Sequence, residues 1–397
     1  MIVPAQKTSA EAVSARILLV DDEPHVTSAI KAALRKEPFA IECARSGEEA
    51  LQMLASTPFD VVVSDERMPG IPGSELLTLV RQRHPKVARI ILSGQATLEA
   101  ALNAINSAQI HRFLLKPCSP KELELAIREA LDARDERAKF EAFKTETAKR
   151  EPTALLEDYE TAIRGIWMGY QPIVHARTGH LHGYEALLRN DHPRWAVPSW
   201  FFSLAEKLGK TLDVGRCIRR EVAKNLEQAP AEAIVCVNVS PMELDDEALV
   251  DGSEDLVRHA RRVVIEITER DSLKSISDLT AKVERLRKLG YRIAVDDLGA
   301  GYAGLASIAA VVPDMVKFDM DLIRGIDVSP TKQKLVEAMT RMSRELHIQT
   351  LAEGIETAAE EQTVSALGVE LLQGFYFGRA VRGFELPTAR PRPSVAG

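Results

Sequence analysis

The chain has 397 residues, of which 45% are apolar and 27% charged. This ordinary globular composition excludes fibrous repeats and long-range disorder, and at roughly 100–200 residues per domain the length predicts two or three domains. Lysine and arginine number 51, against 58 aspartates and glutamates, a net charge of −7. That balance argues against general binding to nucleic acid or to an anionic membrane.

The first residues, 1–14, contain no apolar core of the kind that a signal peptide needs, and we interpret them as an N-terminal tail. No stretch approaches the roughly 20 apolar residues of a membrane helix. The four cysteines are widely spaced, which is typical of reduced thiols. We therefore expect a soluble, cytoplasmic protein.

Short apolar runs in the first 130 residues end abruptly at charged or turn residues. They lie at 17–20, 60–65, 89–94 and 112–117. Helical patterns fill the intervals at 25–36 and 48–55. Buried strands that alternate with helices predict a parallel α/β sheet.

A charged segment at 132–150 follows this first domain and keeps a helical pattern. Its few large apolar residues are Phe140 and Phe143, and Glu151-Pro152 is expected to end the helix. The segment suits a solvent-exposed linker helix or, alternatively, a signalling helix that packs against a partner chain.

A second α/β pattern extends from about residue 155 to 386. Its strand-like runs lie at 170–174, 234–240, 263–269, 292–297, 315–320, 348–354 and 371–375. Strands separated by helices over some 230 residues predict a (β/α) barrel. The Pro-rich end, which includes 389–397, is interpreted as a frayed tail.

Chemically active side chains stand at the strand ends of the first domain. Asp21 and Asp22 follow the first run, Asp65 and Ser93 end later runs, and Lys116 precedes a proline. In an open parallel sheet such positions converge on one crevice. Three carboxylates there would repel one another unless a cation binds, and oxygen ligands favour Mg²⁺. A lysine and a hydroxyl beside them suit a phosphoryl group.

In this order, these motifs resemble the receiver domain of two-component response regulators over about residues 15–134. The resemblance rests on ILLVDDEP, VVVSDERMPGIPG, ILSGQA and RFLLKP. It implies that Asp65 accepts a phosphoryl group from a histidine kinase and that Asp21 and Asp22 hold Mg²⁺. Ser93 and Lys116 would contact the phosphate, and Phe113 stands at the family's aromatic switch position.

The second domain carries more acids near its strand ends. The polar residues in question are Glu185, Asn238, Glu266, Glu269, Asp296, Asp297, Lys317, Glu353, Glu356 and Gln373. The catalytic face of a barrel is built from strand C-termini, so these groups are expected to gather there. Such a carboxylate cluster implies one or two hard divalent cations, Mg²⁺ or Mn²⁺, and suits two-metal cleavage of a phosphodiester.

A GxGxxG pattern at Gly299, Gly301 and Gly304, with Asp319 further on, superficially matches a dinucleotide fingerprint. Asp296 and Asp297, which only Leu298 separates from the first glycine, would repel a pyrophosphate. We interpret the glycines as a flexible loop beside a metal site. A dinucleotide-dependent oxidoreductase remains the third hypothesis.

The second domain resembles the EAL domain, the cyclic di-GMP phosphodiesterase module, over about residues 158–388. The motifs are YQPIV, GYEALLR, NVSP, EITE, DDLGAGYAGL, VKFDM, AEGIET and QGF. Leu298, where the family usually has Phe, and Ala303-Gly304 depart from the pattern in a loop linked to dimerisation. They put the regulation in question more than the chemistry.

This resemblance implies roles for individual residues. One metal would be ligated by Glu185, Asn238, Glu266 and Asp296, and a second would be approached by Asp296, Asp297 and Glu356. Catalysis would rest on Lys317, Glu353 and the metal ligand Glu185. The substrate contacts would be Gln171, Arg189, Asp319 and Gln373. Glu269 would anchor the DDLGAG loop.

Two minor features are interpreted as surface positions. His180 and His182 have metal-like spacing but lie in a turn, and the pairs Arg219-Arg220 and Arg261-Arg262 are expected in solvent. No helix-turn-helix or zinc motif accompanies the arginines, so DNA binding is not expected.

The resulting prediction is an α/β protein with a flavodoxin-like (βα)5 receiver domain at 15–131, a helical linker at 132–157 and a TIM-like (β/α)8 EAL domain at 158–388. It would hydrolyse cyclic di-GMP to linear pGpG under control of Asp65 phosphorylation. It would use two metals in the EAL site and one in the receiver, and it would form a homodimer or higher homo-oligomer. The alternative is a non-catalytic cyclic di-GMP receptor that signals through protein contacts.

Overall fold

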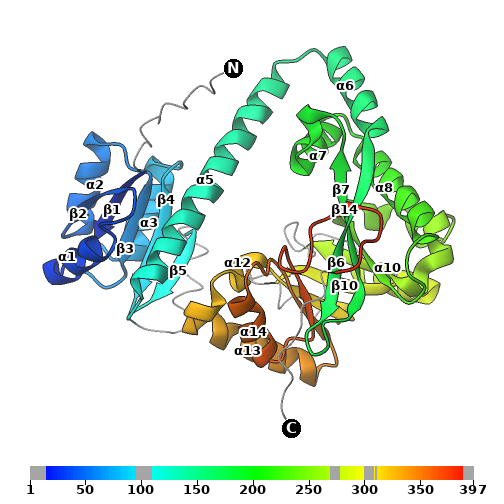
Figure 1. The fold of residues 1–397 in the computed structure, drawn as a ribbon. Coiled ribbons are helices and arrows are strands. Elements are labelled where there is room, and N and C mark those ends of the chain that lie inside the picture. Colours follow the sequence, from blue (N-terminus) through cyan, green and yellow to red (C-terminus); the bar gives the residue numbers. More distant parts are fainter. Residues whose placement is uncertain (1–14, 95–109, 269–277, 299–307, 309–310, 388–397) are drawn as a thin grey trace, which may run out of the picture. The chain divides into compact units, whose positions relative to one another are not determined.

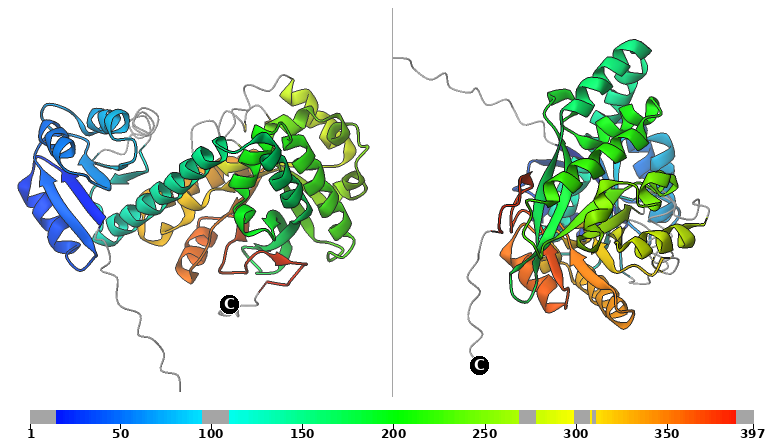
Figure 2. Two further views of the ribbon diagram at one scale, coloured as in Figure 1. Left: turned by 90° about the horizontal axis from the view of Figure 1, so that it is seen from above. Right: turned by 90° about the vertical axis from the view of Figure 1, so that its right-hand side faces the viewer.

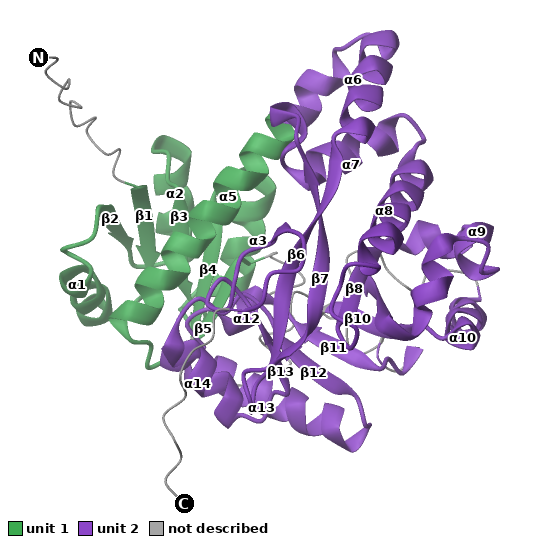
Figure 3. Ribbon diagram, turned by 45° about the vertical axis from the view of Figure 1, so that its right-hand side comes forward, with its two compact units in different colours: residues 1–142 green, residues 143–397 purple. Residues whose placement is uncertain are grey.

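The computed structural model describes residues 15–94, 110–268, 278–298, 308 and 311–387, except for the side chains at 115, 268 and 297. The chain divides into two compact units, 1–142 and 143–397 (Figures 1 and 3). Each is described by itself.

The first unit is built on one parallel five-stranded sheet. Its strands are β1 (Ala15–Val20), β2 (Phe39–Ala44), β3 (Val61–Asp65), β4 (Ala88–Ser93) and β5 (Arg112–Leu115). Their order is β2-β1-β3-β4-β5, with every pairing parallel. The predicted flavodoxin-like sheet is thereby confirmed, and it includes a strand, β2, that the apolar runs did not reveal.

Helices cover both faces of this sheet, since alternate strand residues point to opposite sides. They are α1 (Pro24–Ala33), α2 (Gly47–Ser56), α3 (Gly73–Arg83) and the start of α5 (Pro120–Ala148). Leu18 and Val62 share one buried cluster with Leu76 of α3. Ile17 shares the opposite cluster with Ile127 of α5.

Helix α5 is the last helix of the first unit and the predicted linker helix in one unbroken element of 29 residues (Figure 2). Its final turns belong to the second unit. There Phe143 is buried, stacks on Trp200 at 4.8 Å between ring centroids, and meets Trp195 edge-on at 5.7 Å. The expectation of a solvated linker is therefore wrong for this end of the helix.

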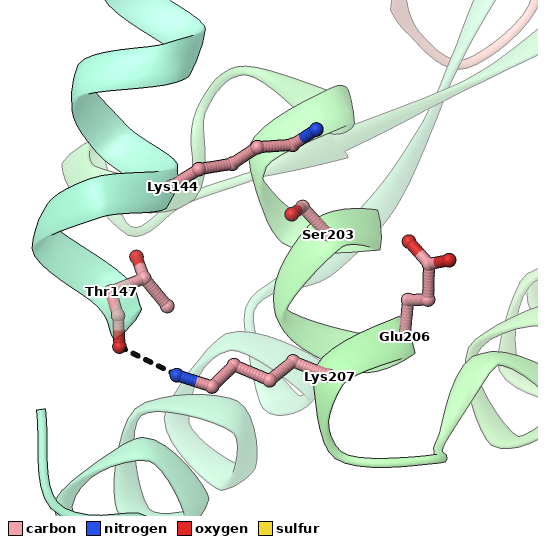
Figure 4. Close-up of a pocket in the computed structure, with 5 residues that line it drawn as sticks. All are labelled: Lys144, Thr147, Ser203, Glu206 and Lys207. Atoms are coloured by element: carbon pink, nitrogen blue, oxygen red, sulfur yellow. Dashed lines mark hydrogen bonds between the residues drawn. The ribbon is translucent and has the colours of Figure 1, made fainter. Parts of the chain in front are cut away.

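The last turn of α5 is fixed to α7 (Pro198–Lys207) by polar contacts as well. Lys207 Nζ donates to the Thr147 carbonyl at 2.8 Å across a pocket that Lys144, Ser203 and Glu206 also line (Figure 4). Helix α6 (Pro152–Arg164) begins after Glu151, as the Glu-Pro pair predicts.

The second unit is a closed eight-stranded barrel. Its strands are β6 (Ile166–His175), β7 (Leu181–Asn190), β8 (Ile234–Val239), β9 (Val263–Thr268), β10 (Arg292–Leu298), β11 (Met315–Phe318), β12 (Gln349–Ala352) and β13 (Leu371–Gln373). β13 pairs back to β6 and closes the ring, and β14 (Val381–Arg382) adds to β6 outside it. The TIM-like prediction is confirmed, with two differences. The hairpin strand β7 escaped prediction, and β6 runs antiparallel to both neighbours.

Helices and short 3₁₀ turns connect the barrel strands. Besides α6 and α7 they are η1 (Pro193–Trp195), α8 (Thr211–Leu226), η2 (Pro241–Asp245), α9 (Glu247–Val250), η3 (Asp255–Arg262), α10 (Leu279–Leu289), α12 (Met320–Ile323), η5 (Ile326–Val328), α13 (Pro330–Glu345) and α14 (Ala358–Ala366). No helix in the described ranges is long and apolar enough to cross a bilayer.

The barrel interior is layered. One buried apolar cluster contains Ile173, Cys236, Val264, Ala294, Met315, Leu351 and Leu371. Two residues further along six of these strands or their ends stand Asn238, Glu266, Asp296, Lys317, Glu353 and Gln373. Because strand side chains repeat every second residue, both sets face the same side. An apolar layer thus closes the barrel beneath a polar layer near the strand ends.

Candidate functional site

The first site lies at the carboxyl edge of the five-stranded sheet. Lys116, directly after β5, reaches Asp21 Oδ2 at 2.7 Å and Asp65 Oδ1 at 2.5 Å. Both aspartates are buried. Burial alone would lower the pKa of Lys116, but its bonds to Asp21 and Asp65 outweigh this and raise it. The structure thus brings together three predicted residues from three strand ends.

The backbone around Asp65 is closely packed. Its Oδ2 accepts from the Arg67 amide at 2.7 Å. A Cβ on Gly73, at the start of α3, would lie 2.1 Å from the Asp65 carbonyl oxygen, so only glycine lets this helix approach. Ser93 is buried at the end of β4, while Asp22 is exposed. Phe113 is half-buried against a cluster on one face of the sheet.

The second site gathers four carboxylates around one ammonium group. The fully buried Lys317 Nζ lies 2.5 Å from Glu353, 2.9 Å from Glu266, 3.3 Å from Asp296 and 3.5 Å from Glu185. These five residues come from five different strands or strand ends. Residues up to 168 positions apart in sequence therefore form one cluster, which contains five of the ten residues expected to gather at the strand ends.

Amide side chains orient the Glu185 carboxylate. Asn238 Nδ2 donates to its Oε1 at 3.0 Å, and Gln373 Nε2 donates to its Oε2 at 2.6 Å. Gln373 Nε2 also reaches Gln171 Oε1 at 3.1 Å, and Gln171 donates to the Gly378 carbonyl at 3.0 Å. Both oxygens of Glu185 are thereby held by neutral donors as well as by Lys317.

Burial and like charge dominate the electrostatics of this cluster. Burial raises the pKa of Glu266 to about 8, partly offset by Lys317 and reinforced by Glu185 and Asp296. Burial raises the pKa of Glu353 well above 4.5. For Lys317, burial opposes the charged form, but the surrounding carboxylates prevail and hold its pKa well above 10.5. With all four carboxylates ionised, the cluster would carry three more negative charges than Lys317 neutralises, and a bound cation would stabilise that ionised form.

Other predicted residues lie apart from these contacts. Asp319 is buried and caps α12 by accepting from the Asp321 amide at 2.6 Å. Arg189 donates to the Leu188 carbonyl at 2.8 Å, and burial lowers its pKa. Glu356 is exposed and pairs with Arg324 at 2.8 Å, and no described contact joins it to Lys317. The Asp297 side chain and all of Glu269 lie outside the described residues.

The donor chemistry of the cluster fits a hard cation. Glu266 Oε2 is buried and accepts no hydrogen bond within the described residues, and Gln373 Oε1 is in the same state. Carboxylate and amide oxygens are the ligands that Mg²⁺ and Mn²⁺ prefer. Among the described side chains, however, the carboxylates converge on the Lys317 ammonium, and no three acidic, His or Cys groups surround another point.

Two surface interpretations are corrected. Arg219, expected in solvent, is buried and ion-paired to three acids. His182 is half-buried and its Nδ1 lies 3.3 Å from His175 Nε2, while burial lowers its pKa to about 4. His180 is exposed as expected. In both corrected cases the partners are distant in sequence or on the neighbouring strand, so local composition carried no signal.

Comparison with known proteins adds two family matches. The receiver-domain model of response regulators matches residues 17–128, and the EAL domain model matches residues 157–380. The fold and the two strand-end sites thus define a receiver domain followed by an EAL domain. The chain belongs to the EAL domain family.

Individual relatives agree with this assignment. MucR of Pseudomonas aeruginosa, a bifunctional diguanylate cyclase/cyclic di-GMP phosphodiesterase, is 30% identical over 60% of this chain, which covers 36% of MucR. RocR, a cyclic di-GMP phosphodiesterase of the same organism, is 26% identical over 91% of this chain and 95% of its own length. The chain spans between 26% and 45% of the length of the other first relatives.

Solved structures match the barrel region. The MucR phosphodiesterase in complex with c-di-GMP has a TM-score of 0.52 and 30% identity, covering 57% of this chain and 97% of that one. BlrP1 of Klebsiella pneumoniae, in its calcium/cy-diGMP complex, has a TM-score of 0.52 and 29% identity, covering 57% of this chain and 59% of BlrP1.

Proposed function

We propose that this protein hydrolyses cyclic di-GMP to linear pGpG in the barrel and that phosphorylation of Asp65 regulates the reaction. The observation that carries the proposal is the cluster of Glu185, Glu266, Asp296 and Glu353 around the buried Lys317. RocR, which matches 91% of this chain over 95% of its own length, is named a cyclic di-GMP phosphodiesterase.

In this proposal Glu353 accepts the proton of the attacking water, and Lys317 lies beside it. Glu353 lies 2.5 Å from Lys317 Nζ, and burial raises its pKa well above 4.5. A carboxylate with a raised pKa is a stronger base, and it is most effective when its pKa lies near the pH of the reaction. The water's oxygen would form the new bond to phosphorus, and its proton would go to Glu353. The P–O3′ bond would break, and the leaving ribose O3′ would take a proton from solvent to become a hydroxyl.

The remaining residues would hold the reacting groups in place. Asn238 and Gln373 each donate a hydrogen bond to a different oxygen of Glu185 and so orient its carboxylate. Gln171, Arg189 and Asp319 remain proposed substrate contacts. Fixing several groups before the reaction removes entropy from the barrier.

We propose Mg²⁺ or Mn²⁺ as the physiological metal, held by Glu185, Asn238, Glu266 and Asp296, with a second ion near Asp296, Asp297 and Glu356. Such ions would activate water and neutralise charge on the phosphate. The net negative charge around Lys317 and the buried oxygen of Glu266 support a cation here.

In the receiver, Asp65 would accept the phosphoryl group from a histidine kinase. Lys116, already paired to Asp65 at 2.5 Å, would neutralise the added charge, and Asp21 and Asp22 would hold Mg²⁺. The new charge would bias the receiver between two states. Ser93 and Phe113 are the proposed reporters of that change, and a homodimer or higher oligomer is the proposed assembly.

The testing experiment is incubation of the purified chain with cyclic di-GMP and Mg²⁺, with pGpG followed by chromatography. Turnover that disappears in Glu185→Gln supports the proposal. Binding without turnover, with either Mg²⁺ or Mn²⁺ and with or without a phosphate mimic, supports the alternative of a non-catalytic receptor.

A further inference from the structure

A buried ionic cluster lies behind the end of strand β8, away from the carboxylates around Lys317. Its centre is Arg219 of α8, whose side chain is 1% exposed. Nε and Nη2 bond both oxygens of Glu254 at 2.6 and 2.7 Å. Nη2 also reaches Asp246 Oδ2 at 2.8 Å, and Nη1 pairs with Glu243. One guanidinium thus uses three nitrogens to hold three acids.

The three acids all belong to the segment that follows β8. Glu243 lies in η2, Asp246 caps α9 by accepting from the Ala248 amide at 3.3 Å, and Glu254 precedes η3. Within the described contacts Arg219 therefore ties this segment to helix α8. Loss of these ion pairs would remove contacts that fix the chain leaving β8.

Glu243 connects Arg219 to the turn that follows barrel strand β8. Its Oε2 accepts from both the amide and the hydroxyl of Ser240, each at 2.9 Å. Ser240 stands two residues after Asn238, whose Nδ2 donates to Glu185 Oε1 at 3.0 Å. A continuous series of hydrogen bonds and two peptide units therefore links Arg219 to the orientation of Asn238.

A glycine in helix α8 leaves room for the Glu243 carboxylate. A Cβ on Gly215 would lie 1.9 Å from Glu243 Oε1, so a larger residue there would expel the carboxylate. Glu243 is buried, and burial raises its pKa while Arg219 opposes the rise. Without Arg219 the carboxylate would lose its compensating charge and would either bind a proton or move towards water, releasing Ser240.

We propose that Arg219 is a positioning residue for the barrel site, which it serves by holding the β8–η2 turn so that the Asn238 amide stays on Glu185. The inference rests on the proposed function for its catalytic consequence only. The structural consequence, a turn that loosens without Arg219, is independent of any activity.

The test compares Arg219→Met with Arg216→Met in the full-length chain. Arg216 lies one helical turn away and makes a bidentate pair with Asp246 at 2.7 and 2.9 Å, but its side chain is 45% exposed. Hydrogen exchange followed by mass spectrometry would be read on peptides covering 238–246. We expect at least about 10-fold faster exchange there in Arg219→Met, and a change within about 2-fold in Arg216→Met.

Kinetics with cyclic di-GMP and Mg²⁺ form the second readout. Arg219→Met should lower kcat at least about 10-fold with KM within about 3-fold, at a temperature where thermal scans show both variants folded. Adding Glu243→Gln, which removes the buried charge and keeps an acceptor for Ser240, should recover most of kcat. If Arg219→Met alone does not fold, Glu243→Ala replaces it, since that variant leaves Arg219 paired with Asp246 and Glu254.

Unchanged exchange at 238–246 overturns the proposal, and so does faster exchange with an unchanged kcat. A kcat loss that Glu243→Gln does not relieve, or that follows only the unfolded fraction, also overturns it. If the parent chain shows no turnover, the proposed function fails, while the exchange measurement still decides whether Arg219 holds the turn.

Discussion

Glu266→Gln tests the electrostatics of the barrel cluster in the metal-free chain. Burial raises the pKa of Glu266 from 4.5 to about 8. Between these values the folded chain binds a proton that the unfolded chain does not, so this carboxylate lowers the free energy of unfolding as the pH rises. Each pH unit inside the window is worth about 1.4 kcal/mol.

From pH 5.5 to 7.5, the parent chain should therefore lose about 2 kcal/mol more stability than Glu266→Gln does. The amide cannot ionise, so it removes this contribution while nearly keeping the shape. This difference in unfolding free energy is a maximum, because the neighbouring charged groups can rearrange around the ionised carboxylate. Above pH 7 and without metal, the variant should be more stable than the parent. Charged groups in functional sites commonly lower the stability of a protein in this way.

The assay is urea unfolding with EDTA at both pH values, followed by tryptophan fluorescence. All three tryptophans, Trp167, Trp195 and Trp200, lie in the second unit, so the signal reports the barrel. Glu232→Gln, an exposed site with the same charge change, is the control. An equal pH dependence in the parent and in Glu266→Gln would refute the reasoning.

Three further predictions concern the receiver site, the end of α5 and the metal dependence of the barrel site. Asp65→Asn should abolish labelling by acetyl phosphate on a phosphate-affinity gel, and persistent labelling would place the acceptor elsewhere. Phe143→Ala should cost the second unit about 3–5 kcal/mol in urea unfolding, because this buried ring packs on Trp195 and Trp200; a loss below about 1 kcal/mol would mean that the end of α5 is not docked. Ca²⁺ should support cyclic di-GMP binding by calorimetry with at least about 10-fold slower hydrolysis than Mg²⁺, since its coordination is looser; equal rates would contradict this.

The sequence predicted the polar centres better than the framework around them. Asp65, Lys116, Lys317 and Glu353 follow short apolar runs, and because parallel strands end on one side, their convergence follows from topology alone. Strand β7 escaped notice because Glu185 and Arg189 interrupt its apolar residues, so that no apolar run longer than Ala186–Leu188 marks it as a buried strand. Its partner β6 runs antiparallel, which the expectation of a regular barrel did not include.

Long-range packing explains the other misses. Residues 132–142 are rich in charged side chains, which predicts a solvent-exposed helix. Phe143, near the end of the same helix, is nevertheless buried against two tryptophans. The pair Arg219-Arg220 resembled a solvated surface because the acids that bury Arg219 stand 24 to 35 residues later. Tertiary partners of this kind leave no periodic signal in one sequence.

The most direct test of the account is the product of the barrel site. Purified chain with cyclic di-GMP and Mg²⁺, with and without phosphorylation at Asp65, should release one pGpG for each cyclic di-GMP consumed. Glu353→Gln should slow this at least about 100-fold by removing the proposed base. Complete absence of pGpG in both phosphorylation states, in a chain that binds cyclic di-GMP, would contradict the account.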